Sequence, residues 1–277
     1  MAWTITGDLD EYLAAAAGFL EARPVRNTRP LTVAAKLRAR GMTAYGEDRP
    51  LFGWSRSPDG GVDAAFSQTP PFPVLFSAMP RSAAASLAGS LSRLGRRVPG
   101  VTGAAGAAQA FAARWREDTG QCAQVQDRER LFRLGELVPP SPPPSGRART
   151  AGAADHGLIA GWFGEFAREA GTPLGDAADQ LSYGGLTLWE DGGTAVAVAG
   201  TTRQVAGMAR VAPVYTPPQH RRHGYAAAAT AAVSQAARDA GAAEVVLFTD
   251  LANPTSNALY QRLGYRPVED HVVLSFG

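Results

Sequence analysis

Residues 214–226 combine charged side chains, glycine and proline in an order that could bind an anion. They read Val-Tyr-Thr-Pro-Pro-Gln-His-Arg-Arg-His-Gly-Tyr-Ala, and an alanine-rich run follows them as far as Gly241. The pattern predicts a strand that stops at the prolines, a basic loop, and a helix that begins after Gly224. The first turn of a helix leaves backbone N–H groups unpaired, and with the helix dipole they attract anions. We therefore expect a phosphate-bearing ligand here, with Arg221 and Arg222 adding positive charge.

The run Arg221-x-x-Gly224-x-Ala226 resembles the Q/R-x-x-G-x-G/A loop of the GCN5-related N-acetyltransferases, the GNAT superfamily. In that family the loop binds the pyrophosphate of coenzyme A. Further features follow in the family's order: a strand at 244–249, a turn at Asn253, a short helix with Tyr260, and a last strand after Gly264. The resemblance covers residues 147–277 and implies the GNAT fold with acetyl-CoA as the cofactor.

The resemblance also implies which residues contact the cofactor. The end of the strand before the loop would pair with the pantetheine arm, the loop would hold the pyrophosphate, and the asparagine turn would reach the arm. These residues are Val214, Tyr215, Thr216, Arg221, Arg222, His223, Gly224, Tyr225, Ala226, Asn253 and Asn257. Two alternatives stay open, because Asn253 could instead form its own turn and Asn257 could support Asn253 or cap the short helix.

Two residues are candidates for proton transfer. Tyr260 matches the family tyrosine that acts as general acid toward the departing thiolate, although a core aromatic beside Leu259 and Leu263 is the structural alternative. The expected strand at 204–215 contains no acid, which departs from many family members. Asp250 is then the nearest candidate for a general base, and capping of the following turn is its alternative role.

These residues together predict an N-acetyltransferase that transfers an acetyl group to a primary amine of a small molecule. Direct attack of the amine in a ternary complex is the mechanism that the resemblance implies. A CoA-binding sensor or scaffold without turnover is the alternative from another class, and an amine on a protein is the alternative acceptor. We expect residues 172–185 and the first half of the chain to shape the acceptor pocket.

Composition excludes several other classes of protein. The chain has 277 residues, a formal net charge of +2 and one cysteine, Cys122. So small a charge does not indicate a nucleic-acid partner, and one cysteine excludes an internal disulfide and a cysteine-rich zinc site. There is no apolar run of about 18 residues to span a membrane and no basic segment typical of a signal peptide. We expect a cytoplasmic enzyme without a bound metal.

A proline-rich run divides the sequence. Residues 139–146 read Pro-Pro-Ser-Pro-Pro-Pro-Ser-Gly, which favours an extended linker over a helix or a central strand. The sequence predicts an accessory domain at 1–138, a linker at 139–146 and a catalytic domain at 147–277.

Hydrophobic periodicity and turn residues predict the elements of the catalytic domain. Helices are expected at 155–170 with Asp155 as the cap, 175–182 and 226–240, and strands at 147–150, 186–189, 194–201, 204–215, 244–249 and 265–276. A short helix at the asparagine turn completes the order β-α-α-β-β-β-α-β-α-β, which is the family's. The fold class is therefore α/β with a mixed sheet.

The accessory domain shows a similar order of elements. Helices are expected at 8–23, 30–40, 80–94 and 104–118, and strands at 51–54, 62–68, 74–78, 121–126 and 130–134. Nothing like Arg-x-x-Gly-x-Ala follows residues 74–80. We therefore expect a tandem GNAT fold with a degenerate N-terminal copy, and an unrelated α+β domain is the alternative.

Overall fold

The chain forms two compact units. The computed structural model describes residues 2–171 and 177–277. Unit 1 comprises residues 1–131, 250–252 and 268–277, and unit 2 comprises residues 132–249 and 253–267. Two long strands, β6 (Ala123–Leu134) and β12 (Tyr265–Phe276), contribute residues to both units.

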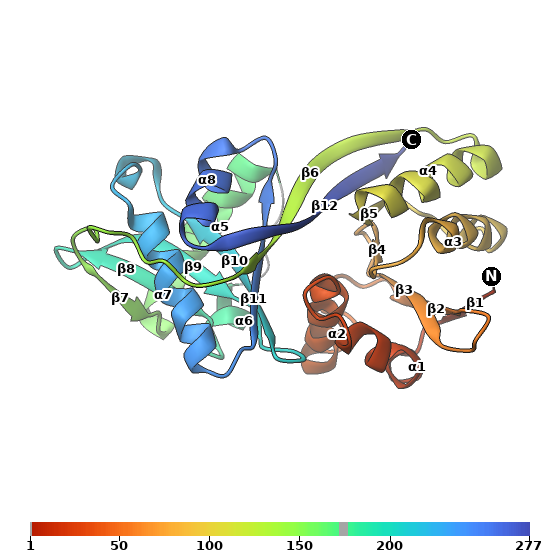
Figure 1. The fold of residues 1–277 in the computed structure, drawn as a ribbon, viewed down its shortest axis with the longest axis horizontal. Coiled ribbons are helices and arrows are strands. Elements are labelled where there is room, and N and C mark those ends of the chain that lie inside the picture. The colour runs from red at the N-terminus through yellow and green to blue at the C-terminus, as the bar shows by residue number, and fades with distance from the viewer. Residues whose placement is uncertain (1, 172–176) are drawn as a thin grey trace. The chain divides into compact units, whose positions relative to one another are not determined.

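Unit 1 is an α/β unit with a mixed sheet. Its elements are β1 (Trp3–Thr6), α1 (Leu9–Glu21), α2 (Thr28–Arg40), β2 (Leu51–Arg56), β3 (Val62–Gln68), β4 (Val74–Phe76), α3 (Arg81–Arg93), β5 (Gly100–Ala104), α4 (Ala105–Thr119) and parts of β6 and β12. The strand order is β1-β2-β3-β4-β5-β12-β6, with β4 and β5 parallel. Figure 1 shows α1 and α2 on one face of this sheet and α3 and α4 on the other.

Unit 2 repeats this plan. Its elements are β7 (Arg147–Thr150), α5 (His156–Ala170), α6 (Ala177–Leu181), β8 (Leu186–Asp191), β9 (Thr194–Thr201), β10 (Met208–Tyr215), α7 (Tyr225–Asp239), β11 (Glu244–Asp250) and α8 (Pro254–Arg262), with parts of β6 and β12. Along its sheet the order is β6-β11-β10-β9-β8-β7, and β10 and β11 are parallel. Gly192 and Gly193 turn β8 into β9 with positive φ angles of 55° and 80°, as a two-residue hairpin requires.

The predicted element order is confirmed in the second half, and the first half has that same order in the structure. Each half runs β-α-α-β-β-β-α-β-α-β, so the tandem fold with a repeated N-terminal copy is the observed one. Strands β1 and β5 are absent from the prediction. In β5, Gly100 and Gly103 lower strand propensity, but each is needed: a β-carbon on Gly100 would lie 2.0 Å from Leu274 O, and one on Gly103 would lie 2.8 Å from Phe76 Cβ.

Other bounds differ in detail. The strand expected at 204–215 begins only at Met208, and the two strands expected at 121–126 and 130–134 are the single strand β6. Asp155 does not cap α5, because its carboxylate accepts the Gly152 N–H at 2.8 Å and pairs with Arg149. The first residues of the helix expected at 175–182 lie outside the described part of the chain.

The boundaries between the compact units lie elsewhere than in the expected linker at 139–146. That proline-rich run falls within unit 2, and residues 268–277 at the C-terminal end fall within unit 1. A strand is stable only where its backbone groups are paired, so each part of β6 and β12 groups with the sheet that pairs it. The connectivity of these two strands, rather than the prolines, sets the division.

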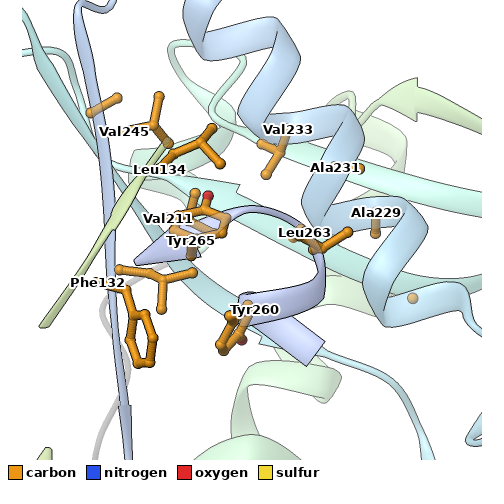
Figure 2. Close-up of a cluster of buried hydrophobic side chains, with 14 of the residues drawn as sticks. Phe132, Leu134, Val211, Ala229, Ala231, Val233, Val245, Tyr260, Leu263 and Tyr265 are labelled. Carbon is orange, nitrogen blue, oxygen red and sulfur yellow. The ribbon is translucent and has the colours of Figure 1, made fainter. Parts of the chain in front are cut away.

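Hydrophobic residues alternate along the strands of unit 2 so that both faces of the sheet are covered. On one face, Leu186, Leu188, Val198 and Tyr215 pack under Ile159, Trp162 and Phe163 of α5. On the other face, Ala197, Val211, Val245 and Leu247 pack under α7 and α8. Figure 2 shows this second cluster, in which Tyr260 of α8 and Leu263, just after this helix, lie beside Tyr265. Through this cluster α8 packs in one core with α7.

Candidate functional site

The loop between β10 and α7 presents a row of unpaired backbone amides. Among the described residues, no backbone or side-chain acceptor takes the N–H groups of residues 222–227. Regular bonding of α7 begins only with Ala228 N, which donates to Gly224 O at 3.1 Å. Free N–H groups at an exposed helix start attract anions, and the helix dipole adds to the attraction. The unpaired N–H groups expected at this loop are therefore present, and their binding of an anion stays a prediction.

Two residues of this loop have a left-handed backbone. Gly224 has a φ of 83° and Arg222 a φ of 67°. Glycine adopts this region without steric cost, whereas a long side chain rarely does. A β-carbon on Gly224 would lie 3.6 Å from Pro144 Cβ, which is an ordinary contact. The backbone angle, and not crowding by the chain, is therefore what requires glycine at 224.

The two arginines of the motif have different surroundings. Arg221 donates from Nε to Thr216 O at 2.9 Å and from Nη2 to Glu169 at 2.6 Å. The exposed side chain of Arg222 has no ion-pair partner in the part of the chain that the structure describes. Arg221 thus fixes the loop to α5, and Arg222 is the cation that can approach a phosphate freely. Sequence reasoning gave both arginines the same role because the pairing with Glu169 spans 52 positions of the chain.

A pair of carboxylates on α5 belongs to this site, and sequence reasoning missed it. The Tyr215 hydroxyl donates to Glu165 Oε2 at 2.9 Å and to Glu169 Oε1 at 3.2 Å. Burial and the hydrogen bond to Glu165 raise the pKa of Tyr215 to about 12, so this phenol stays neutral near pH 7. Glu165 and Glu169 are one helical turn apart and so share a face of α5, which is the only sign of the pair in the sequence.

Strands β10 and β11 separate toward their carboxyl ends. Their parallel register runs from Met208↔Glu244 to Val211↔Leu247, and β10 continues beyond it to Tyr215. A bulge between Val211 and Val214 shifts β10 against β9, and Gln180 Nε2 donates to the Ala212 carbonyl at 2.8 Å inside it. The edge of β10 that faces β11 is therefore left open near its end.

Thr216 lies at the end of this open edge. Its Oγ1 is buried and has no hydrogen-bond partner among the residues described. Buried polar atoms are nearly always hydrogen-bonded in folded proteins, so this oxygen is a candidate contact for a ligand group. Val214, two residues earlier, is partly buried against the core under α7.

The asparagine turn holds itself together. Asn253 caps α8, since its Oδ1 accepts the Ser256 N–H at 3.0 Å, and its carbonyl accepts Nδ2 of Asn257 at 2.8 Å. Both asparagines thus make the structural contacts that were their alternative roles. The exposed Asn253 side-chain amide still has donor capacity for a ligand, because its capping bond uses only the oxygen.

Tyr260 lies in the core cluster that also contains Tyr225 at the start of α7. Its ring meets the ring of Tyr265 edge-on, with centroids 6.0 Å apart. Figure 2 shows both residues in this cluster. Its hydroxyl has no hydrogen-bond partner in the described chain, and burial raises the pKa of Tyr260 to about 12. The side chain is therefore a neutral phenol with an unused donor at neutral pH.

Asp250 ends β11 and is exposed. Its Oδ1 accepts the Ala252 N–H at 2.7 Å, which is the turn-capping contact held as its alternative role. A second carboxylate, Asp127 of β6, is electrostatically coupled to Asp250 within unit 1. Burial first, and then the charges of Glu129 and Asp250, raise the pKa of Asp127. Nothing in the sequence indicated Asp127, because it fell between two expected strands.

The described residues were compared with two patterns, a cluster of metal-ligating side chains and a membrane-spanning helix. They contain no group of three histidine, cysteine or acidic side chains arranged to hold a metal ion. None of their helices combines the length and the apolar surface that crossing a bilayer would need.

Known proteins resemble this chain in sequence family and in fold. The family model described as "Acetyltransferase (GNAT) family" matches residues 157–265. No curated protein matches the sequence. Among solved structures, a GNAT acetyltransferase from Colwellia psychrerythraea is similar over 100% of this chain and 99% of its own, with 12% identity and a TM-score of 0.61.

Two further structures share the fold over nearly the whole chain. A tandem GNAT protein from the clavulanic acid biosynthesis pathway is similar over 100% of this chain and 98% of its own, with 13% identity and a TM-score of 0.57. A fungal β-N-acetylglucosaminidase with a glucosamine N-acetyltransferase region is similar over 99% of this chain and 38% of its own. The identity is 10% and the TM-score is 0.59.

The sequence family and the geometry agree. The matched segment 157–265 contains α5, the loop of free amides and the tyrosine of α8. Acetyltransferases of this family use acetyl-CoA and act on amines. Residues 157–265 therefore match the GNAT acetyltransferase family, which indicates an acyltransferase, and the whole chain shares the fold of a tandem GNAT protein.

Proposed function

We propose that this protein transfers an acetyl group from acetyl-CoA to a primary amine of a small molecule. The observation that carries the proposal is the exposed row of free N–H groups at residues 222–227, beside the open edge of β10. An anion site next to an unpaired strand edge suits a ligand with a diphosphate at one end and amides along its length.

The residues present fit coenzyme A. The free amides and Arg222 would hold the diphosphate, and the backbone of Val214 to Thr216 would pair with the amides of the pantetheine arm. The buried Thr216 Oγ1 is the orphan that such an arm would satisfy. The side-chain amide of Asn253 is a further donor toward the arm. The thioester supplies an activated acetyl group, and the chain supplies its placement.

Tyr260 would stabilise the charge that develops on sulfur as the acetyl group leaves. Complete transfer of its proton is unfavourable, because a phenol with a pKa of about 12 and a thiol of about 8.5 differ by roughly 5 kcal/mol. A hydrogen bond from the neutral phenol to the developing thiolate avoids that cost and still lowers the barrier. The hydroxyl of this buried residue has no hydrogen-bond partner in the described chain, which supports this role over a full acid.

Asp250 is our candidate for the group that receives the proton of the amine. It is exposed at the end of β11. Asp127, which is coupled to Asp250, binds a proton more readily than an ordinary aspartate. We propose that Asp250 takes the place of the acid that β10 lacks.

A small amine is the acceptor that the relatives favour. The tandem GNAT protein of similar fold belongs to the biosynthesis of clavulanic acid, and the fungal region of similar fold is a glucosamine N-acetyltransferase. Both concern small molecules rather than proteins. We propose that this chain works on such an acceptor in the cytoplasm.

The test is a thiol-release assay with acetyl-CoA and a panel of acceptors. The panel should include amino sugars, polyamines, amino acids and a lysine-containing peptide. We expect amine-dependent thiol release and an acetylated small amine by mass spectrometry. Binding of CoA without turnover on any member would favour the sensor, and turnover only on the peptide would favour a protein acceptor.

A further inference from the structure

We propose that Asp191, at the turn between β8 and β9, positions the loop that would bind the diphosphate, residues 222–227. It does so by joining residues 144–146, the end of the proline-rich run, to the first turn of α7. The proposal rests on the proposed function, because it concerns the loop that would bind CoA. It assigns a binding role to a segment that sequence alone marks as a linker. All of its contacts lie within unit 2.

Asp191 joins two parts of the chain through a single carboxylate oxygen. Its Oδ2 accepts the Ser145 Oγ hydrogen at 2.6 Å and also accepts the hydroxyl of Tyr225, the first residue of α7. These two hydrogen bonds, from Ser145 first and Tyr225 second, hold the pKa of Asp191 below its usual value. The carboxylate is therefore ionised at neutral pH, and hydrogen bonds to a charged acceptor are the stronger kind.

The segment is also held along its own length. Trp189 Nε1 donates to Ser145 O at 2.8 Å. Gly146 has a φ of 97°, and a β-carbon there would lie 2.1 Å from Glu190 O, so only glycine lets the chain lie this close to β8. At its other side, Pro144 lies in contact range of the β-carbon position of Gly224. The proline segment thus runs from the β8–β9 turn to the loop.

This arrangement compensates for the lack of bonding inside the loop. The amides of residues 222–227 have no partner in the described chain, so the chain must fix their direction by other contacts. The Tyr225 side chain is 8% exposed, and the His223 ring stacks on it with centroids 5.5 Å apart. A loop that is already ordered loses less entropy when a ligand binds.

Charge and hydrogen bonding predict opposite effects, which makes Asp191 a sharp test. A carboxylate near the loop repels a diphosphate, so its charge alone would weaken binding. Its hydrogen bonds order the loop and would strengthen binding. Asp191→Asn keeps an acceptor oxygen and removes the charge, whereas Asp191→Ala removes both. The proposal therefore expects the alanine variant to bind CoA more weakly and the asparagine variant to bind at least as well as wild type.

The experiment is calorimetric titration of CoA into the full chain, with pantetheine as a competing probe that lacks the diphosphate. We expect Asp191→Ala to lower CoA affinity by about 10-fold and to leave pantetheine affinity unchanged. Asp239→Ala, at the opposite end of α7, removes an exposed carboxylate and should change neither affinity. Tyr225→Phe should reproduce much of the loss, and combined with Asp191→Ala it should add little to it.

Gly146→Ala tests the proline segment without changing the loop or Asp191. Because the new β-carbon meets the backbone of Glu190, the segment must move, and we expect CoA affinity to fall several-fold with pantetheine affinity unchanged. Wild-type affinity in Asp191→Ala and in Gly146→Ala would overturn the inference while leaving the proposed function intact. Equal losses for CoA and pantetheine would also overturn it, and no CoA binding by wild type would instead reject the proposed function.

Discussion

The strand-to-helix turns of the two units share a place in the fold and differ in their hydrogen bonds. In unit 2, the turn from β10 to α7 leaves the amides of residues 222–227 free. In unit 1, the turn from β4 to α3 pairs Ser77 N with Ala65 O at 2.9 Å and Ala78 N with Asn27 Oδ1 at 2.8 Å. Asn27 is fully buried. We call the unit 1 turn closed because Ser77 N and Ala78 N are paired, although the N–H groups of residues 81–83 at the start of α3 have no partner among the described residues either.

The helices after β5 and β11 show the same contrast. Counted from the cap residue, Asn253, Asn257 and Tyr260 of unit 2 correspond to Ala104, Ala108 and Phe111 of unit 1. Phe111 is fully buried and stacks on Trp115 at 5.7 Å, so it serves the core alone. The three polar side chains of unit 2 at these positions are thus replaced by apolar side chains in unit 1.

The largest effect is expected when Tyr260 is changed to its unit 1 counterpart. Tyr260→Phe removes the hydroxyl that would stabilise the leaving sulfur, and we expect kcat to fall by about 10²–10³. CoA affinity should stay within about two-fold, since the ring still fills the core. Because the pKa of Tyr260 is about 12, its ionisation should not lower wild-type kcat below roughly pH 11. Unchanged kcat in the phenylalanine variant would remove Tyr260 from the mechanism.

Asn27→Ala tests the closed turn of unit 1. The change removes the acceptor of the partly buried Ala78 N–H and one of the donors to the Leu20 carbonyl, which Arg23 N still contacts. We therefore expect unfolding in urea to require about 1–3 kcal/mol less free energy. The affinity of the remaining folded protein for CoA should equal that of wild type. A marked loss of affinity in well-folded Asn27→Ala would show that unit 1 takes part in cofactor binding.

Gly224→Ala tests the open turn of unit 2. Alanine at a φ of 83° costs about 1–2 kcal/mol, and relief of that strain would reorient the free amides. We expect CoA affinity to fall by about 10-fold or more. Gly241→Ala is the matched control, because it ends the same helix with a φ of 89° and open space around it. Equal CoA affinity in the two variants would mean that only strain, and not the loop geometry, is being measured.

Arg222→Ala is expected to give the smallest of these effects. Its guanidinium is exposed, so its attraction for a phosphate is screened by salt, and we expect CoA affinity to fall by roughly 5-fold at low ionic strength. The difference from wild type should shrink as salt is added. Arg81→Ala removes an exposed cation at the start of the sister helix α3 and should have no effect. A salt-independent loss would point to packing rather than charge.

Local pattern was enough to predict the loop, its helix and the tandem order, since prolines, glycines and periodicity are read within one element. What the sequence did not reveal depends on contacts across the chain. The partner of Arg221 is Glu169, Asp191 bonds both Ser145 and Tyr225, and Gly100 faces Leu274. No local rule contains such pairs. Strand β5 was missed for the same reason, because its glycines are required by close contacts with residues far along the sequence.

We propose that CoA binds at the open turn of unit 2 and not at the closed turn of unit 1, and titration of CoA into the full-length protein tests this most directly. We predict saturable binding with one CoA per chain, strongly weakened by Gly224→Ala and unaffected by Asn27→Ala. Binding of two CoA molecules per chain, or no binding by folded wild-type protein, would contradict it.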